Sequence, residues 1–191
     1  MPVSYQCGFK TEANDIAREI RLELGLAPMD PLDPWMLAHH LEIPIRTLSS
    51  MQDHASFGVH HFSCVDISAF SAVTIFNGRE RHILHNDFHN LGRQASSLAH
   101  ELAHALLHHP PTPALDDQGG RNWDQTVEDE ASWLGGALLI SEEAALAIER
   151  KKLSLTQAAE IYKVSKDMIR FRLNVTGAQK RIMRISRVAP H

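Results

Sequence analysis

Five consecutive residues, His100 to His104, have the types and spacing of a catalytic metal site. The run reads His-Glu-Leu-Ala-His, and histidines four positions apart lie one turn apart on the same face of a helix, where both imidazoles can bind one zinc ion. A carboxylate directly after the first histidine, here Glu101, can take a proton from a water molecule that the ion activates. The run therefore predicts a zinc hydrolase that acts on peptide bonds, with Glu101 as the catalytic base.

The sequence around this run is typical of an amphipathic helix. Between Arg93 and His109 there is neither Gly nor Pro, and apolar residues recur at helical spacing until Pro110 and Pro111 end the segment. Because the chain contains 13 histidines, the motif alone is only suggestive. Its helical context is what places the two histidines side by side.

Two histidines leave a catalytic zinc site one protein ligand short. The metzincin pattern is excluded, since it needs Gly seven and His ten positions after the first histidine, where this chain has Leu107 and Pro110. A carboxylate on a later helix is the remaining source. Residues 126–140 predict such a helix, with Thr126 or Asp124 as its N-cap.

Glu130 is the acid of this second helix that we expect to complete the site. At about 100° per residue, Glu130 lies roughly 70° from the centre of the apolar face, Glu128 lies about 90° away, and Asp129 is on the opposite side. Glu128 stays open as the alternative ligand. His108 lies about 6 Å beyond His104 along the helix axis and is expected to be solvated or to support the ligands from outside.

Both helices resemble segments of the ImmA/IrrE family of zinc metallopeptidases. The stretch RQASSLAHELAHALLHH (93–109) carries the histidine motif, and EDEASWLGGALLIS (128–141) is similar to the Glu-Ala-Asn helix of that family. The resemblance continues upstream through 71–86 and downstream through 155–177. Ser132 stands where the family commonly has Asn, a difference that removes no metal ligand but is expected to change substrate fit.

The resemblance implies that His100, His104 and Glu130 hold the metal. It also implies a substrate, a helix-turn-helix transcriptional repressor whose cleavage derepresses genes of a mobile element, a toxin-antitoxin locus or a stress response. Zinc is the expected ion, with Mn²⁺ as the alternative. Two other functions stay open: a non-catalytic metal-containing regulator that binds DNA or a repressor, and a general aminopeptidase.

The composition is that of an ordinary globular protein. With 191 residues, 43% of them hydrophobic and 22% charged, the chain can bury one sizeable core. It has no leader-like start and no apolar run of about 18 residues, and Cys7 and Cys64 are widely separated. We therefore expect a cytoplasmic protein with reduced thiols and no membrane partner.

The charge is divided unevenly along the chain and predicts two parts. Residues 1–149 carry 8 basic and 21 acidic groups, a balance of −13, whereas residues 150–191 carry 11 and 2, a balance of +9. We expect a peptidase domain over 1–149 and a basic helical subdomain with a tail over 150–191. Within the latter, 155–173 resembles a helix-turn-helix, in which Lys166, Arg170 and Arg172 are candidates to contact nucleic acid or a protein partner.

The remaining patterns predict an α+β fold with a small antiparallel sheet before the catalytic helix. The expected strands are 43–48, 72–76 and 79–85, and Asn77-Gly78 suits a tight hairpin turn. Two more helices are expected over 11–24 and 34–41. An edge strand of such a sheet could hold an extended substrate. The candidates to stabilise the oxyanion of the reaction are Tyr162 and the cluster His82, His85 and His89.

Overall fold

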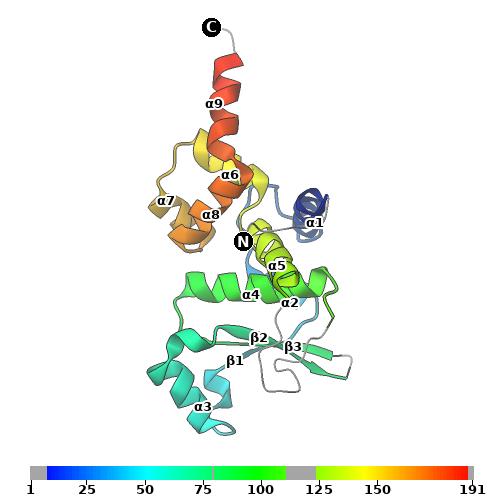
Figure 1. Cartoon of the computed structure of the whole chain (residues 1–191), viewed down its shortest axis with the longest axis vertical. Coiled ribbons are helices and arrows are strands. Elements are labelled where there is room, and N and C mark those ends of the chain that lie inside the picture. Colours follow the sequence, from blue (N-terminus) through cyan, green and yellow to red (C-terminus); the bar gives the residue numbers. More distant parts are fainter. Residues whose placement is uncertain (1–7, 79, 111–123, 189–191) are drawn as a thin grey trace.

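The structure is a computed structural model and describes residues 8–78, 80–110 and 124–188 (Figure 1). The elements that follow confirm the predicted α+β class. In chain order they are α1 (Phe9–Glu23), α2 (Pro34–His40), β1 (Ile45–Thr47), α3 (Ser56–His60), β2 (Ala72–Asn77), β3 (Glu80–His85), α4 (Leu91–Leu106), α5 (Gln125–Leu139), α6 (Glu142–Arg150), α7 (Leu155–Tyr162), α8 (Lys166–Thr176) and α9 (Ala178–Val188).

The sheet has three strands in the order β1-β3-β2. It is mixed, not purely antiparallel as predicted, because β1 runs parallel to β3 while β2 pairs with β3 as an antiparallel hairpin. The hairpin register pairs Thr74 with Ile83 and Asn77 with Glu80. The strand β2 therefore extends to Asn77, and the turn starts at Gly78, whose φ of 63° is the left-handed conformation that glycine adopts without cost.

Helix α4 lies at the centre of the molecule, with the sheet on one side and α5 on the other (Figure 1). The side chain of Asn90 caps its first turn by accepting a hydrogen bond from the backbone N–H of Arg93. Leu98 and Leu102 are fully buried in the main core, together with Ile83 of β3 and Leu134 of α5. Burial of Leu98 and Leu102 fixes the rotation of α4 about its axis. It thereby determines the side to which the polar face of α4 points.

Two glycines let other backbones approach α4 closely. A Cβ added to Gly135 of α5 would lie 3.0 Å from the carbonyl oxygen of Ala99, and one added to Gly92 would lie 2.9 Å from the backbone nitrogen of Ser165. The first contact joins α5 to α4 near its middle. The second joins the start of α8 to the start of α4.

The C-terminal helices pack against the helices that surround the site. Helices α7 and α8 form the predicted helix-turn-helix, in which Ser165 caps α8 through its side chain and Lys163 occupies the turn with φ 54°. A second core of buried residues joins them to α4, α5 and α6. Among the described residues, no single helix is long and apolar enough to cross a membrane, although α5 and α6, bent by 53° at their break, would reach that length and composition together. The thiol of Cys64 is free and exposed, and Cys7 lies outside the described residues.

Candidate metal centre

The two histidines of α4 point their outer ring nitrogens at each other. The Nε2 atoms of His100 and His104 are 3.1 Å apart, and the ring centroids are 4.8 Å apart with planes at 75°. Two nitrogens at this separation face a common point, as in a metal site bound by histidines one helical turn apart. Burial, helped by the neighbouring His100, lowers the pKa of His104 to about 4. This imidazole is therefore neutral, as a metal ligand must be, well below neutral pH.

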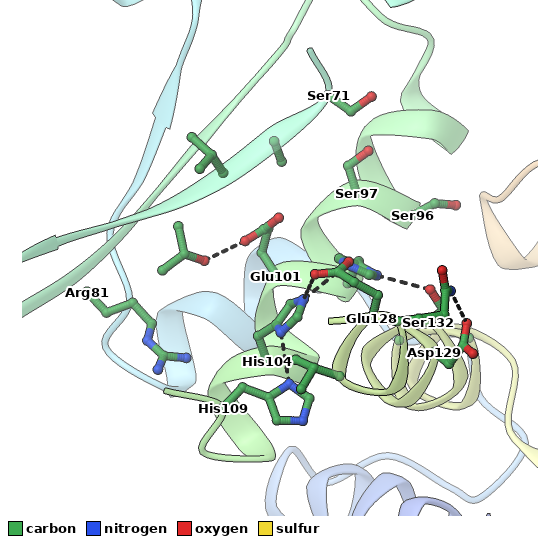
Figure 2. Close-up of a pocket in the computed structure, with 18 of the residues that line it drawn as sticks. Ser71, Arg81, Ser96, Ser97, Glu101, His104, His109, Glu128, Asp129 and Ser132 are labelled. Atoms are coloured by element: carbon green, nitrogen blue, oxygen red, sulfur yellow. Dashed lines mark hydrogen bonds and ion pairs between the residues drawn. The ribbon is translucent and has the colours of Figure 1, made fainter. Parts of the chain in front are cut away.

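Glu128 on α5 supplies a carboxylate to the same point. Its Oε2 is 3.1 Å from Nε2 of His100 and its Oε1 is 3.7 Å from Nε2 of His104, and one donor atom from each of the three residues lies within 4.8 Å of the others. Figure 2 shows the Glu128 side chain reaching across from α5 to the imidazoles. The hydrogen bond with His100 holds the pKa of Glu128 below its usual value, so the acid is ionised.

Glu130, the predicted third ligand, lies elsewhere. The structure brings Glu128 to the imidazoles of His100 and His104, whereas Oε2 of Glu130 is 3.4 Å from Nε2 of His109. The sequence analysis measured the angles of Glu128 and Glu130 from the centre of the whole apolar face of α5. In the structure, part of that face packs against α4 and part against α1. Gly135 marks the line that touches α4, and Glu128 stands seven residues, about two turns, before it on the same face.

The donor set fits a divalent transition-metal ion. Two imidazole nitrogens and one carboxylate oxygen are the protein ligands of catalytic zinc sites that keep one position open. The inner nitrogen of each imidazole also has a partner, as ligand histidines usually do. Nδ1 of His100 is 3.4 Å from Oγ of Ser132, and Nδ1 of His104 is 2.8 Å from Nδ1 of His109.

Glu101 lies next to the ligand cluster and is held by the sheet. The hydroxyl of Thr74 on β2 donates a hydrogen bond of 2.5 Å to its Oε2, and the backbone of Thr74 also interacts with the carboxylate (Figure 2). Burial raises the pKa of the Glu101 carboxyl, against the lowering effects of the Thr74 hydrogen bond and of His100. A carboxylate with a raised pKa is a better proton acceptor than an exposed one.

These residues line a cleft of about 760 Å³ between the sheet and α5. Along β2 the lining runs from Ala72 to Phe76, and on the far side it continues to Met168 and Phe171 of α8. Arg81 of β3 also lines it, and its Nη1 atom is buried without a hydrogen-bond partner among the residues that the structure describes. The cleft thus combines the candidate metal ligands, the buried carboxyl group of Glu101 and the guanidinium of Arg81.

The profile of the M78 peptidase family, described as the IrrE N-terminal-like domain, matches residues 60–174 of this chain. The match spans β2, β3 and helices α4 to α7 and most of α8, which include every residue of the cluster. The chain belongs to the M78 peptidase family. This confirms the resemblance drawn from the sequence and identifies the chain as a metallopeptidase. No curated protein matches the chain.

In this M78 peptidase, none of the predicted oxyanion donors lies where one is needed. The hydroxyl of Tyr162 donates to the carbonyl oxygen of Met29, and Nε2 of His89 contacts the carbonyl oxygen of Ile67. His85 is buried against the Trp35 ring. His82 alternates with the core-facing Ile83 along β3, so it is on the other face of the sheet.

Three residues that the sequence analysis did not select contact the site: Thr74, Arg81 and His109. The pairing of the hairpin strands could have predicted Thr74 and Arg81. Both lie on the face of the sheet that carries Ile83, since Thr74 is the partner of Ile83 and Arg81 is two residues before it. His109 follows the end of α4, and no helical spacing predicts its position. His108, expected to be solvated or supporting, is exposed.

The structure also corrects the basic set on α8. Arg172, predicted to contact nucleic acid or a partner, is fully buried. Its Nε donates to the carbonyl oxygen of Ile140, and its guanidinium packs over the Trp133 ring. Burial lowers the pKa of Arg172 to about 10. It therefore helps to join α8 to the end of α5, whereas Lys166 and Arg170 are exposed.

Proposed function

We propose that this M78 peptidase is a zinc-dependent endopeptidase with His100, His104 and Glu128 as metal ligands and Glu101 as the catalytic base. The observation that carries the proposal is the convergence of Nε2 of His100, Nε2 of His104 and a Glu128 oxygen beside a carboxylate held by β2. Zinc is the ion that best suits this donor set, with Mn²⁺ as the alternative. The cleft extends along β2 to both sides of Glu101, which suits a chain that passes through more than a chain end.

Within the site, each side chain has a distinct task. A bound zinc ion supplies a Lewis acid that makes water more acidic and polarises a carbonyl group. Oε1 of Glu101 takes the proton of the attacking water and returns it to the amine that leaves, while the Thr74 hydroxyl fixes Oε2. The strand β2 pairs with β3 on one side only among the described strands. Its other edge can form backbone hydrogen bonds with an extended substrate.

Arg81 is the group best placed to stabilise the negative oxygen that develops during attack. It shares the cleft with Glu101 and His104, and its Nη1 is buried with no described partner. The Glu101 carboxylate acts on the pKa of Arg81 and the Arg81 cation acts on that of His104, so the three groups lie within electrostatic range. A cation held there before the substrate arrives costs no rearrangement during the reaction.

Replacing Arg81 with Met is expected to lower kcat about 100-fold while KM and zinc content change little. The reason is that the lost interaction exists mainly in the transition state, and one such donor contributes roughly 10²- to 10³-fold. Steady-state kinetics on a peptide that contains the cleaved bond, with zinc measured by elemental analysis, tests this. An Arg81→Met enzyme with unchanged kcat assigns the oxyanion to another group, and Arg46→Met, a change on the neighbouring strand β1, serves as the control.

For the substrate we propose a helix-turn-helix transcriptional repressor on another chain, cut so that genes of a mobile element, a toxin-antitoxin locus or a stress response are derepressed. The resemblance to the ImmA/IrrE family supports this choice. The alternative is a regulator that binds DNA or a repressor without cleaving it. On α8, only Lys166 and Arg170 of the three predicted contacts are exposed, and Arg170 pairs with Asp167 of its own helix. The structure thus gives that alternative little support.

The test is to incubate the purified chain, with zinc added, with the repressor encoded beside its gene. We expect fragments of the repressor in molar excess over the peptidase, because an enzyme turns over. Removal of metal with a chelator should stop cleavage, and zinc in slight excess should restore it. Stoichiometric binding without fragments, under conditions in which zinc is bound, contradicts the endopeptidase assignment and favours the regulator.

A further inference from the structure

His109 follows the end of α4 and folds back over the ligand His104. The helix ends in a Schellman motif, in which His108 takes a left-handed backbone with φ 54°. The N–H of His109 then bonds to the carbonyl oxygen of His104 at 3.0 Å, and the N–H of His108 bonds to that of Ala105 at 3.1 Å. This turn carries the His109 ring to within 4.9 Å of the His104 ring, measured between centroids.

The His109 ring lies between His104 and Glu130. Its Nδ1 is 2.8 Å from Nδ1 of His104, and its Nε2 is 3.4 Å from Oε2 of Glu130. Only 10% of the His109 side chain and 12% of the Glu130 side chain are exposed. Figure 2 shows the His104 and His109 rings connected by a dashed line, with His109 below His104 in this view. Glu130 is thus buried away from the Nε2 atoms of His100 and His104, but its neighbour His109 contacts His104.

The proton positions along this chain of contacts follow from the ligand role of His104. When Nε2 of His104 binds a metal, the ring proton of this neutral imidazole is on Nδ1, which then donates to Nδ1 of His109. His109 accepts at Nδ1 and therefore carries its own proton on Nε2. Nε2 of His109 lies 3.4 Å from Oε2 of Glu130, so the carboxylate is close enough to attract that proton.

We propose that His109 and Glu130 form a positioning relay, Glu130–His109–His104, that orients His104 for the metal and fixes its tautomer. The inference rests on the proposed function, because it takes His104 as a ligand. Ligand histidines commonly donate their second N–H to a carboxylate or carbonyl group, and here a second imidazole connects ligand and acid. The negative charge of Glu130 acts through His109 and makes Nε2 of His104 a stronger electron-pair donor to the metal. It also explains why Glu130 is buried without being a ligand.

Two nearly isosteric variants separate the relay from simple packing. The change His109→Asn keeps an oxygen acceptor close to the place of Nδ1, whereas His109→Leu fills similar space without an acceptor. We expect His109→Leu to weaken zinc affinity about 10- to 100-fold, the usual effect of losing an outer partner of a ligand. We expect His109→Asn to recover most of that loss. Both are measured on the full chain by competition with a zinc chelator.

Nuclear magnetic resonance of the zinc-loaded protein labelled with ¹⁵N-histidine tests the proton positions directly. We expect His104 to carry its proton on Nδ1 and His109 on Nε2, with the His104 N–H shifted downfield by its hydrogen bond. In His109→Leu this resonance should move upfield and exchange faster with water. A His109 protonated on Nδ1 in the wild type, or equal zinc affinity in His109→Leu and wild type, overturns the relay.

These readouts do not depend on peptidase activity, so the two proposals can fail separately. If the wild type binds zinc and cleaves its substrate but the His109 variants bind zinc equally well, only the relay is wrong. If the wild type binds zinc with the expected tautomers yet cleaves nothing, the endopeptidase assignment is wrong and the relay stands. A wild type that binds no zinc contradicts both.

Discussion

Replacing Glu101 with Gln is expected to abolish cleavage while the protein keeps its fold and its metal. Gln preserves the size of the side chain and can still accept the Thr74 hydrogen bond, but it cannot take a proton from water. General acid–base groups contribute about 100- to 10,000-fold to rate. Because burial raises the pKa of the Glu101 carboxyl, we expect a loss at the upper end of that range. Fragment formation over time, with zinc content measured in parallel, gives the result.

Glu160→Gln is the matched control for this change. Glu160 is exposed on α7, so the same chemical substitution there should leave both cleavage and zinc content at wild-type levels. Cleavage by Glu101→Gln at the wild-type rate would show that another group accepts the proton. Cleavage lost together with zinc would mean that Glu101 acts in metal binding, which the proposed division of tasks does not allow.

The second large effect is expected from a pair of changes two residues apart on α5. Glu128→Gln removes the negative charge and the best oxygen donor from the ligand cluster. A structural zinc site with four ligands binds with roughly 10–16 kcal/mol, so one ligand is worth about 3 kcal/mol, or roughly 100-fold in affinity. We expect Glu128→Gln to lose zinc at least to that extent, measured by chelator competition, and to lose activity in proportion.

Glu130→Gln should have a much smaller effect, within about 10-fold in zinc affinity. The amide oxygen of Gln can stay near Nε2 of His109, and no atom of Glu130 is part of the candidate ligand cluster. Cobalt substitution gives a second measurement, since the visible spectrum of the ion reports its coordination. The opposite pattern, with zinc lost from Glu130→Gln and retained by Glu128→Gln, would return the ligand role to Glu130.

Much of this site could be predicted because short-range spacing determines it. Histidines four residues apart face the same way on any helix, and the buried stripe of α4 makes that helix certain. The acidic helix α5 and its Asp124 cap also follow from local sequence. The same holds for the Ser165 cap of α8, where a short polar side chain precedes a helical stretch.

What could not be predicted depends on how separate elements meet. The choice between Glu128 and Glu130 is a rotation of α5 by part of a turn, and the contact of Gly135 with the backbone of Ala99 decides it. The parallel pairing of β1 joins segments almost 40 residues apart. Arg172 looks like a surface cation in the sequence, and only the packing of α8 on the end of α5 shows that it is enclosed.

The proposed metal ligands lie on helices, whereas the side of the cleft proposed to bind the substrate is a β-strand. His100, His104 and Glu128 are on two helices whose separation a glycine contact sets, whereas Thr74 and the open edge belong to β2. We therefore expect changes along β2 to alter which substrate sequences fit the cleft without moving the proposed metal site. Specificity in this scaffold can therefore diverge between related enzymes, or be redesigned in the laboratory, while the chemistry stays constant.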